Sequence, residues 1–247
     1  MTAPATTERM PPIAILAGGL ATRLRPLTET IPKSMVEVAG RPFIEHQLRL
    51  LVREGIIEVV VCSGHLGEQI EEFVGDGARF GCRVRYSSDG GKQLGTGGAL
   101  KRALPMLGKC CMVMYGDSYL DTNFRAIFVA FQKSGQPALM TVCLNDAGLG
   151  LSNAEFANGT IVCYDKVNRT STMRHIDYGL AVLDTEVVRS WPATGAFDLA
   201  ETFGDLARRK LLAGYEVQER FYEIGSPEGL AETDAFIRRT MYIKDRS

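Results

Sequence analysis

The chain has 247 residues, 45% of them hydrophobic, so one core could bury roughly three quarters of the surface of the unfolded chain. The formal net charge is −1 and the Lys and Arg residues form no basic block, which excludes a typical nucleic-acid partner. The cysteines form no Cys-x-x-Cys pair, and no apolar run is as long as a membrane span. We therefore expect a cytoplasmic protein with reduced thiols and no membrane partner.

The N-terminal stretch is polar and lacks the apolar core of a signal peptide. We expect residues 1–11 to be disordered. Residues 12–247 contain no internal repeat and no low-complexity linker, which indicates a single domain.

The first predicted element is a buried strand over residues 13–17, which stops at Gly18 and Gly19. Three cations follow at Arg23, Arg25 and Lys33, with two prolines that stiffen the segment between them. Backbone N–H groups of a glycine turn and fixed cations together form an anion-binding concavity. The stretch therefore predicts a polyphosphate site.

Two common phosphate motifs do not fit this stretch. A P-loop needs a glycine before its Lys-Ser/Thr pair, and here a proline precedes Lys33. A dinucleotide fingerprint needs a third glycine, but Leu20, Ala21 and Thr22 follow Gly19. An NAD-dependent oxidoreductase is thus disfavoured.

Strands and helices then alternate along the chain. Predicted strands cover residues 34–38, 56–62, 83–87, 110–115 and 138–143, and predicted helices cover 42–54, 63–74, 96–104 and 124–133. Because the strands are almost continuously apolar, we expect a mostly parallel sheet with helices on both faces. Ligands bind such sheets beyond the carboxyl ends of the strands, where Gly18 lies.

The spacing changes after a glycine-rich loop at 146–152. Short strands are predicted over 154–156, 161–164 and 175–183, forming an antiparallel extension that closes over the substrate. Helices are predicted over 197–212 and 227–238, with a strand over 216–224 between them. The apolar residues of the last helix suit the core and a contact between copies equally well, so a homo-oligomer stays open.

Two further segments carry polar or small residues at expected ligand edges. Asp117 follows the apolar strand 110–115, and a carboxylate buried there needs a cation as partner. The glycines from Gln93 to Gly98 let the backbone approach a flat ring closely. A helix N-cap and a tight turn are the structural alternatives. The three histidines have no Ser, Cys or metal-spaced partner and are interpreted as structural, so no hydrolase triad is predicted.

The stretch from Leu16 to Lys33 resembles the signature Leu-Ala-Gly-Gly-x-Gly-Thr-Arg-Leu-x-Pro-Leu-Thr, followed by Pro-Lys, of the sugar nucleotidyltransferases (NDP-sugar pyrophosphorylases). Ala21 departs from it, since the family usually has glycine there. The resemblance extends to about Ala231. It implies an α/β fold, a three-layer α/β/α Rossmann-like mixed sheet of the glycosyltransferase-A-like nucleotidyltransferase type, with a small antiparallel extension over the substrate site.

The resemblance also implies roles for single residues. Arg23 would hold the β- and γ-phosphates of a nucleoside triphosphate, and Lys33 would stabilise the α-phosphate. Asp117 and Glu223 would bind Mg²⁺, although Glu223 replaces the usual Asp and is longer by a methylene. The implied nucleotide-binding residues are Leu16, Ala17, Gly18, Gly19, Thr22, Arg23, Gln93, Gly95, Thr96 and Gly98.

The sugar-phosphate side is implied by two further segments. Lys166 resembles the family's phosphate-binding lysine, and Asp165 before it would contact a sugar hydroxyl. Asp177 and Gly179 resemble the Asn-x-Gly segment beneath the sugar ring. An ionised Asp177 accepts hydrogen bonds but cannot donate them, so the sugar contacted there would differ from the usual hexoses.

The implied reaction condenses a nucleoside triphosphate with a sugar 1-phosphate and releases pyrophosphate. The motif around Leu94 to Gly98 and the segment Phe221 to Gly225 resemble most the heptose 1-phosphate guanylyltransferase branch, which favours GTP and a heptose. A hexose 1-phosphate thymidylyl-, uridylyl- or cytidylyltransferase is an alternative. A regulatory subunit that binds a nucleotide sugar without turnover is another.

Overall fold

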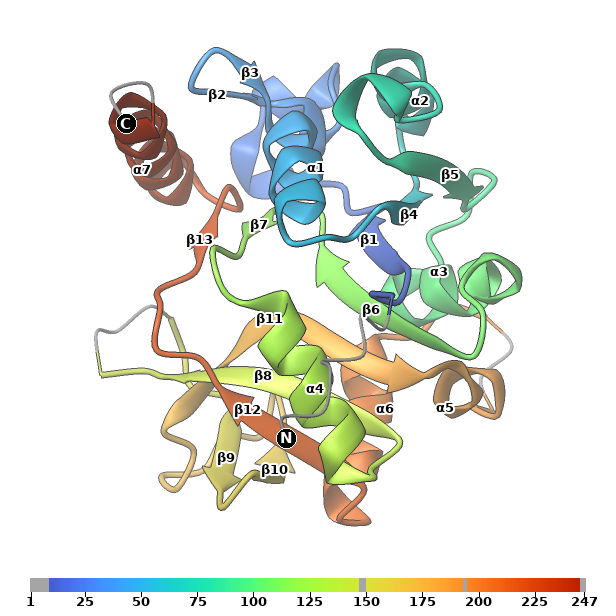
Figure 1. The fold of residues 1–247 in the computed structure, drawn as a ribbon, viewed down its shortest axis with the longest axis vertical. Helices are drawn as coiled ribbons and strands as arrows, with labels where there is room; N and C mark the ends of the chain where they lie inside the picture. Colours follow the sequence, from blue (N-terminus) through green and yellow to red (C-terminus); the bar gives the residue numbers. More distant parts are fainter. Residues whose placement is uncertain (1–8, 147–149, 193–194, 245–247) are drawn as a thin grey trace, which may run out of the picture.

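A nine-stranded mixed sheet runs through the protein. The structure is a computed structural model that describes residues 9–146, 150–192 and 195–244. The strand order is β5-β4-β1-β6-β11-β8-β12-β10-β9 (Figure 1). The strands are β1 (Ile13–Ala17), β4 (Glu58–Ser63), β5 (Arg83–Ser88), β6 (Cys110–Tyr115), β8 (Ala138–Leu144), β9 (Ala154–Ala157), β10 (Thr160–Tyr164), β11 (His175–Asp184) and β12 (Leu212–Glu216).

The first half of this sheet is parallel. β1 pairs in parallel with β4 on one side and with β6 on the other, and β5 lies beyond β4. The chain therefore builds outward from β1 in one direction and then crosses back to β6. This reversal makes the carboxyl ends of β1 and β6 a topological switch point, where open α/β sheets bind ligands.

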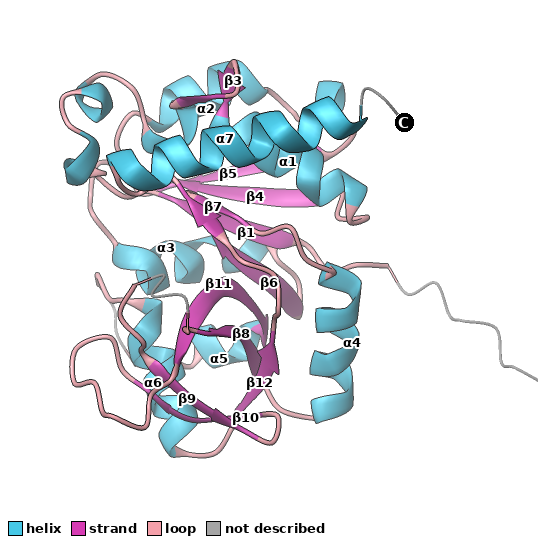
Figure 2. Ribbon diagram, turned by 90° about the vertical axis from the view of Figure 1, so that its left-hand side faces the viewer, coloured by secondary structure: helices cyan, strands magenta, loops and turns pink. Residues whose placement is uncertain are grey.

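Helices cover both faces of the sheet, as predicted. The alternating side chains of β1 show the division, because Ile13 and Ile15 join one apolar cluster while Ala14 and Leu16 join another. The first cluster includes α1 (Phe43–Arg53), α2 (Gly67–Val74) and α4 (Phe124–Ser134), and the second includes α3 (Gly95–Ala103), α5 (Thr185–Arg189) and α6 (Leu199–Arg208). Figure 2 shows α4 and α6 on opposite sides of the sheet.

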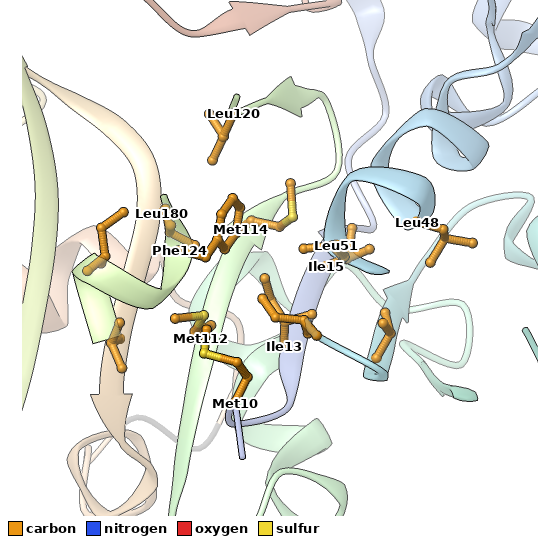
Figure 3. Packing of buried hydrophobic residues seen from close by; sticks show 14 of the residues in the cluster. Met10, Ile13, Ile15, Leu48, Leu51, Met112, Met114, Leu120, Phe124 and Leu180 are labelled. Atoms are coloured by element: carbon orange, nitrogen blue, oxygen red, sulfur yellow. The ribbon is translucent and has the colours of Figure 1, made fainter. Parts of the chain in front are cut away.

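The first cluster extends to the start of the described chain. Met10 is 5% exposed and packs with Ile13 and Met112 (Figure 3). Arg9 lies 2.8 Å from the Glu58 carboxylate. The prediction that residues 1–11 are disordered is therefore wrong for residues 9–11, because the Met10 side chain is buried in this cluster. Residues 1–8 lie outside the described residues.

The antiparallel half differs from the prediction. β11 is not part of an extension but lies inside the main sheet, antiparallel to β6 and to β8. β9 and β10 form the expected hairpin around Asn158 and Gly159, yet the hairpin continues the same sheet through β12 and curls back so that β9 also meets β11. Whether this hairpin closes over a substrate stays a prediction.

The chain after α6 also follows another path. The helix predicted over 197–212 ends at Arg208. The prediction of one strand over 216–224 is wrong, because residues 217–221 are neither helix nor strand. β12 ends at Glu216, and β13 (Tyr222–Glu223) instead pairs with β7 (Ser118–Tyr119). β13 thus forms where the edge of β7 offers it backbone hydrogen bonds, and the local sequence does not show this position.

Short elements complete the fold around the switch point. The strand predicted over 34–38 is a 3₁₀ turn at Lys33–Met35 followed by β2 (Glu37–Val38), which pairs with β3 (Arg41–Pro42). α7 (Pro227–Lys244) packs on this region through Ile237, and its Phe236 ring stacks on Tyr222. Of the predicted loop 146–152, residues 147–149 lie outside the described residues. Across the described chain, we find no helix with the length and apolar character needed to cross a bilayer.

Candidate functional site

A cavity of about 260 Å³ lies at the carboxyl ends of β1 and β6. Backbone of the glycine turn after β1 forms one wall, and the start of α3 forms another. Its lining residues are Leu16, Ala17, Gly18, Gly19, Leu20, Lys33, Ser34, Asp89, Gln93, Gly95, Thr96, Ala99, Tyr115, Gly116 and Asp117. The cavity thus joins most of the predicted nucleotide-binding residues with Lys33 and Asp117, which lie far apart in the sequence.

Close backbone packing shapes the glycine turn. A Cβ atom on Gly64, which follows β4, would lie 2.7 Å from the carbonyl oxygen of Gly18. Only glycine permits this approach, which keeps the two strand ends together. Ala21 adopts a left-handed conformation with φ of 49°, and Thr28 Oγ1 donates a hydrogen bond of 2.8 Å to its carbonyl oxygen. This conformation explains why the signature that this stretch resembles has glycine at that position.

Cations and carboxylates meet at the mouth of the turn. The Lys33 ammonium lies 2.7 Å from Asp117 Oδ2, and the two side chains are only 18% and 23% exposed. Arg23, in the 3₁₀ turn Thr22–Leu24, and Glu223 both approach Gly225, where an added Cβ atom would lie 3.2 Å from Arg23 Nη2 and 3.4 Å from Glu223 Oε1. Burial and then the charge of Asp117 raise the pKa of Glu223, while Arg23 and Lys33 oppose this shift.

The pairing of β7 with β13 brings the two predicted metal ligands together. Glu223 is in register with Ser118, next to Asp117, and the Ile224 N–H donates to the Asp117 carbonyl oxygen at 2.9 Å. Gln47, fully buried on α1, holds the turn after β6 by donating to the carbonyl oxygens of Tyr115 and Ser118. The fold therefore fixes the backbone of both acids.

These acids suit a magnesium ion. Within the described residues there is no group of three or more His, Cys, Asp or Glu side chains that could hold a metal by itself. Mg²⁺ in nucleotide-dependent enzymes commonly uses one or two carboxylates, with water and substrate phosphates as the other ligands. The neighbouring carboxylates fit that donor set, since burial and then the charge of Asp117 raise the pKa of Glu223 and a cation would relieve both effects.

The segment that is predicted to bind the base lies at the start of α3. α3 begins at Gly95 without a side-chain cap, and Phe197 holds the loop by accepting from Gly97 N–H and donating to the Leu94 carbonyl oxygen, each at 3.0 Å. Thr96 donates to Asp198 Oδ1 at 2.8 Å. Three predicted nucleotide-binding residues are not in the cavity wall: Thr22 and Arg23 lie in the 3₁₀ turn, and Gly98 packs against Gly195. Their roles stay predictions.

Three of the four predicted sugar-phosphate residues, Lys166, Asp177 and Gly179, lie beside Tyr115. Lys166 Nζ lies 5.5 Å from the centre of the Tyr115 ring and 3.6 Å from Asp198 Oδ1. Asp177 and Gly179 line a small second cavity, also beside Tyr115. The structure thus links the two predicted subsites through Tyr115 and Asp198.

Asp177 and Asp165 differ in their bonding. Asp177 accepts hydrogen bonds from the Tyr164 hydroxyl at 2.9 Å and from Gly179 N–H at 3.0 Å, yet burial raises its pKa. The Asp165 carboxylate instead accepts from the N–H groups of Val167 and Asn168 and closes its own turn. A contact from Asp165 to a sugar hydroxyl stays a prediction.

Four residues in or beside the candidate site were missed by the sequence analysis: Ser34, Gln47, Asp89 and Asp198. Ser34 and Asp89 line the main cavity, and each has a buried oxygen without a partner among the described residues. Asp89 could have been found, because it follows a parallel strand at the same edge as Gly18. Gln47 and Asp198 act through tertiary contacts that no local pattern reveals.

Two of the three histidines have structural contacts, in line with the prediction. His46 is buried and its Nε2 lies 2.7 Å from the Val38 carbonyl oxygen, and His175 Nε2 lies 3.0 Å from Glu216 Oε1. All six cysteines are free thiols, and burial raises the pKa of the Cys62 thiol to about 12.

Comparisons with curated proteins identify relatives of this chain. It is 42% identical over 115 residues to N-acetylmuramate alpha-1-phosphate uridylyltransferase of Neisseria meningitidis, covering 46% of this chain and 50% of that protein. It is 30% identical over 210 residues to UTP–glucose-1-phosphate uridylyltransferase of Synechocystis, an alignment that covers 78% of this chain and 53% of that protein. The chain thus spans about half the length of these two relatives. It is 27% identical to D-glycero-alpha-D-manno-heptose 1-phosphate guanylyltransferase of Campylobacter jejuni, an alignment that covers 87% of this chain and 94% of that protein.

Solved structures share the fold. A putative glucose-1-phosphate thymidylyltransferase from Bacillus anthracis superposes with a TM-score of 0.82 at 21% identity, covering 93% of this chain and 95% of that chain. HddC from Yersinia pseudotuberculosis, complexed with GMP-PN, superposes with a TM-score of 0.77 at 22% identity, covering 92% of this chain and 100% of that chain. The family model described as nucleotidyl transferase matches residues 13–149, more than half of the sequence, from β1 through the cavity-forming strands. The chain therefore belongs to the nucleotidyl transferase family.

Proposed function

We propose that this protein transfers a nucleotidyl group from a nucleoside triphosphate to a sugar 1-phosphate and releases pyrophosphate, with GTP and a heptose 1-phosphate as the favoured substrates. The observation that carries the proposal is the Lys33–Asp117 pair in the wall of the cavity, with Arg23 and Glu223 beside it. Such alternating charges suit several phosphate groups and a cation held close together.

The reaction needs positioning and charge neutralisation more than proton transfer. An oxygen of the sugar phosphate attacks the α-phosphorus, a new O–P bond forms, and the bond to the β-phosphate oxygen breaks, so pyrophosphate leaves. The second pKa of a phosphate monoester is about 6, and the attacking oxygen is therefore already anionic near neutral pH. No general base is required.

Each charged residue has a place in this scheme. Lys33 neutralises the α-phosphate, Arg23 binds the β- and γ-phosphates, and Lys166 holds the sugar phosphate against Tyr115. Asp117 and Glu223 would hold Mg²⁺, which would supply positive charge to neutralise the phosphates. Asp198 lies beside both Thr96 of the base wall and Lys166, so it positions the two subsites relative to each other.

The relatives support the choice of substrates. The Campylobacter relative, which this chain covers almost completely, is a heptose 1-phosphate guanylyltransferase, and HddC was solved with a guanine nucleotide analogue. The Neisseria, Synechocystis and Bacillus proteins support the alternative, a uridylyl or thymidylyl transfer to another sugar 1-phosphate.

A pyrophosphate-release screen tests the proposal. GTP, ATP, CTP, UTP and dTTP would each be combined with a panel of hexose and heptose 1-phosphates, with Mg²⁺ present. We expect turnover with GTP and a heptose 1-phosphate. Turnover with another pair would keep the reaction and correct the substrates. No turnover with any pair, together with tight binding of a nucleotide sugar, would overturn the proposal in favour of a regulatory subunit.

A further inference from the structure

Asp89 is a buried acid in the wall of the proposed nucleotide cavity. It directly follows β5, and its own N–H donates to the Ser63 carbonyl oxygen at 2.9 Å. The residue is 5% exposed, and its Oδ2 lies 3.3 Å from the position that a Cβ atom on Gly18 would take. Gln93 and Gly95 line the same cavity. The carboxyl group therefore lies between the glycine turn and the predicted base-binding loop.

The hydrogen bonding of this carboxyl group is incomplete. The Leu94 N–H is a partner, but Oδ1 is buried and has no partner among the described residues. Burial raises the pKa of Asp89, and the charge of Arg102 lowers it, but by less than burial raises it. A buried acceptor without a donor destabilises the fold, so its presence in a ligand cavity points to a donor on the ligand.

The nucleobases differ in the donors that they offer. Guanine presents two neighbouring donors, N1–H and the 2-amino group, which match the two oxygens of a carboxylate. Uracil and thymine present one N–H between two carbonyl oxygens, which would repel a carboxylate. Adenine and cytosine place an amino donor next to a ring nitrogen that accepts. An ionised carboxylate therefore suits guanine better than any other common base.

We infer that Asp89 selects guanine by accepting hydrogen bonds from N1–H and the 2-amino group of GTP. This inference rests on the proposed function and names the residue that determines the base. In this arrangement Oδ1 gains the donor that the protein does not provide. Gly95 and Gln93 line the same cavity and would contact the rest of the base.

Inosine triphosphate tests this inference, because ITP lacks only the 2-amino group of GTP. Calorimetry would measure the binding of each nucleotide to the wild type and to Asp89→Asn, with no sugar phosphate present. We expect the wild type to bind GTP about 10- to 100-fold more tightly than ITP, the usual effect of one hydrogen bond to a charged group. In Asp89→Asn the preference should fall to about 3-fold or less. Asp146→Asn, whose side chain is 71% exposed, is the matched control and should keep the wild-type preference.

The outcomes separate this inference from the proposed function. Equal binding of GTP and ITP to the wild type, or an unchanged preference in Asp89→Asn, would overturn the role of Asp89 and leave nucleotidyl transfer standing. Binding of neither nucleotide would overturn both. Thermal unfolding would confirm that Asp89→Asn is folded, and if it is not, the wild-type comparison of GTP with ITP still decides.

Discussion

The Lys33 ammonium and the Asp117 carboxylate lie 2.7 Å apart in the wall of one cavity, although 84 residues separate them in the sequence. Lys33 comes from the turn after the glycine loop, and Asp117 comes from the end of β6, the strand beside β1. The pair places the proposed α-phosphate contact next to a proposed metal ligand. A nucleoside triphosphate that enters here meets both charges together.

Replacement of Asp117 by Asn should weaken magnesium use. Asn keeps the size of the side chain but removes the negative charge that attracts the cation. We expect the Mg²⁺ concentration for half-maximal pyrophosphate release to rise about 10-fold or more. Asp121→Asn is the control, since Asp121 pairs with Arg53 outside the cavity. A Mg²⁺ titration that is the same in Asp117→Asn and the wild type would contradict the assignment.

Glu223 should make stability depend on pH in the absence of magnesium. Burial, followed by the charge of Asp117, raises the folded-state pKa of Glu223 above its usual 4.5. As the pH rises from about 4.5 to this raised pKa, the unfolded chain loses its proton first, so the free energy of unfolding falls. Glu223→Gln has no proton to lose there.

Denaturant unfolding of both proteins between acidic and neutral pH measures this effect. The stability advantage of Glu223→Gln over the wild type should grow with rising pH, and excess Mg²⁺ should reduce it by binding the ionised Glu223. If the difference in the free energy of unfolding between the two proteins does not change with pH, burial does not raise the pKa of Glu223 and the prediction is wrong.

Gly97→Ala should disturb the base-binding loop. A Cβ atom at Gly97 would lie 2.1 Å from the Phe197 ring, which is itself buried. We expect the free energy of unfolding to fall by about 1–3 kcal/mol and nucleotide binding to weaken, because Phe197 must move away from the loop. Gly195→Ala is the matched control, since an added Cβ atom there would have nothing within 4 Å. Equal stability of the two variants would show that Phe197 does not hold the loop.

Ala21→Gly should stabilise the phosphate turn. Ala21 has a φ of 49°, a left-handed conformation that costs an alanine about 1–2 kcal/mol. Because glycine also gains freedom in the unfolded chain, we expect a net gain of up to about 1 kcal/mol. Ala130→Gly, inside α4, should instead lose about 1 kcal/mol. Denaturant unfolding would measure both, and a loss of stability in Ala21→Gly would contradict the strained turn.

The parallel half of the fold was predictable because its signals are local. Apolar runs identified β1, β4 and β6, and the rule that ligands bind at carboxyl ends located Gly18 and Asp117. The segment between β12 and β13 was not predictable in the same way. Residues 217–221 are neither helix nor strand in the structure, and β13 exists because β7, about one hundred residues earlier, offers a free edge.

The candidate site was predictable only in part for a similar reason. Lys33 belongs to a sequence motif with regular spacing, whereas Glu223 was identified by resemblance alone. Glu223 lies near Asp117 only because β7 pairs with β13, and this long-range pairing leaves no local pattern in the sequence. Asp89 carries no motif, and its importance lies in a missing hydrogen bond that only three-dimensional packing reveals. Asp198 likewise depends on α6 reaching Thr96.

Pyrophosphate release by Lys33→Met tests the central claim most directly, because methionine keeps the apolar stem of lysine and removes its charge. We predict that turnover falls about 100-fold or more while the protein stays folded, since Lys33 stabilises charge at the reacting phosphate. Lys133→Met, at an exposed position on α4, should match the wild type. Wild-type turnover in Lys33→Met would contradict the claim that this cavity is where the nucleotide reacts.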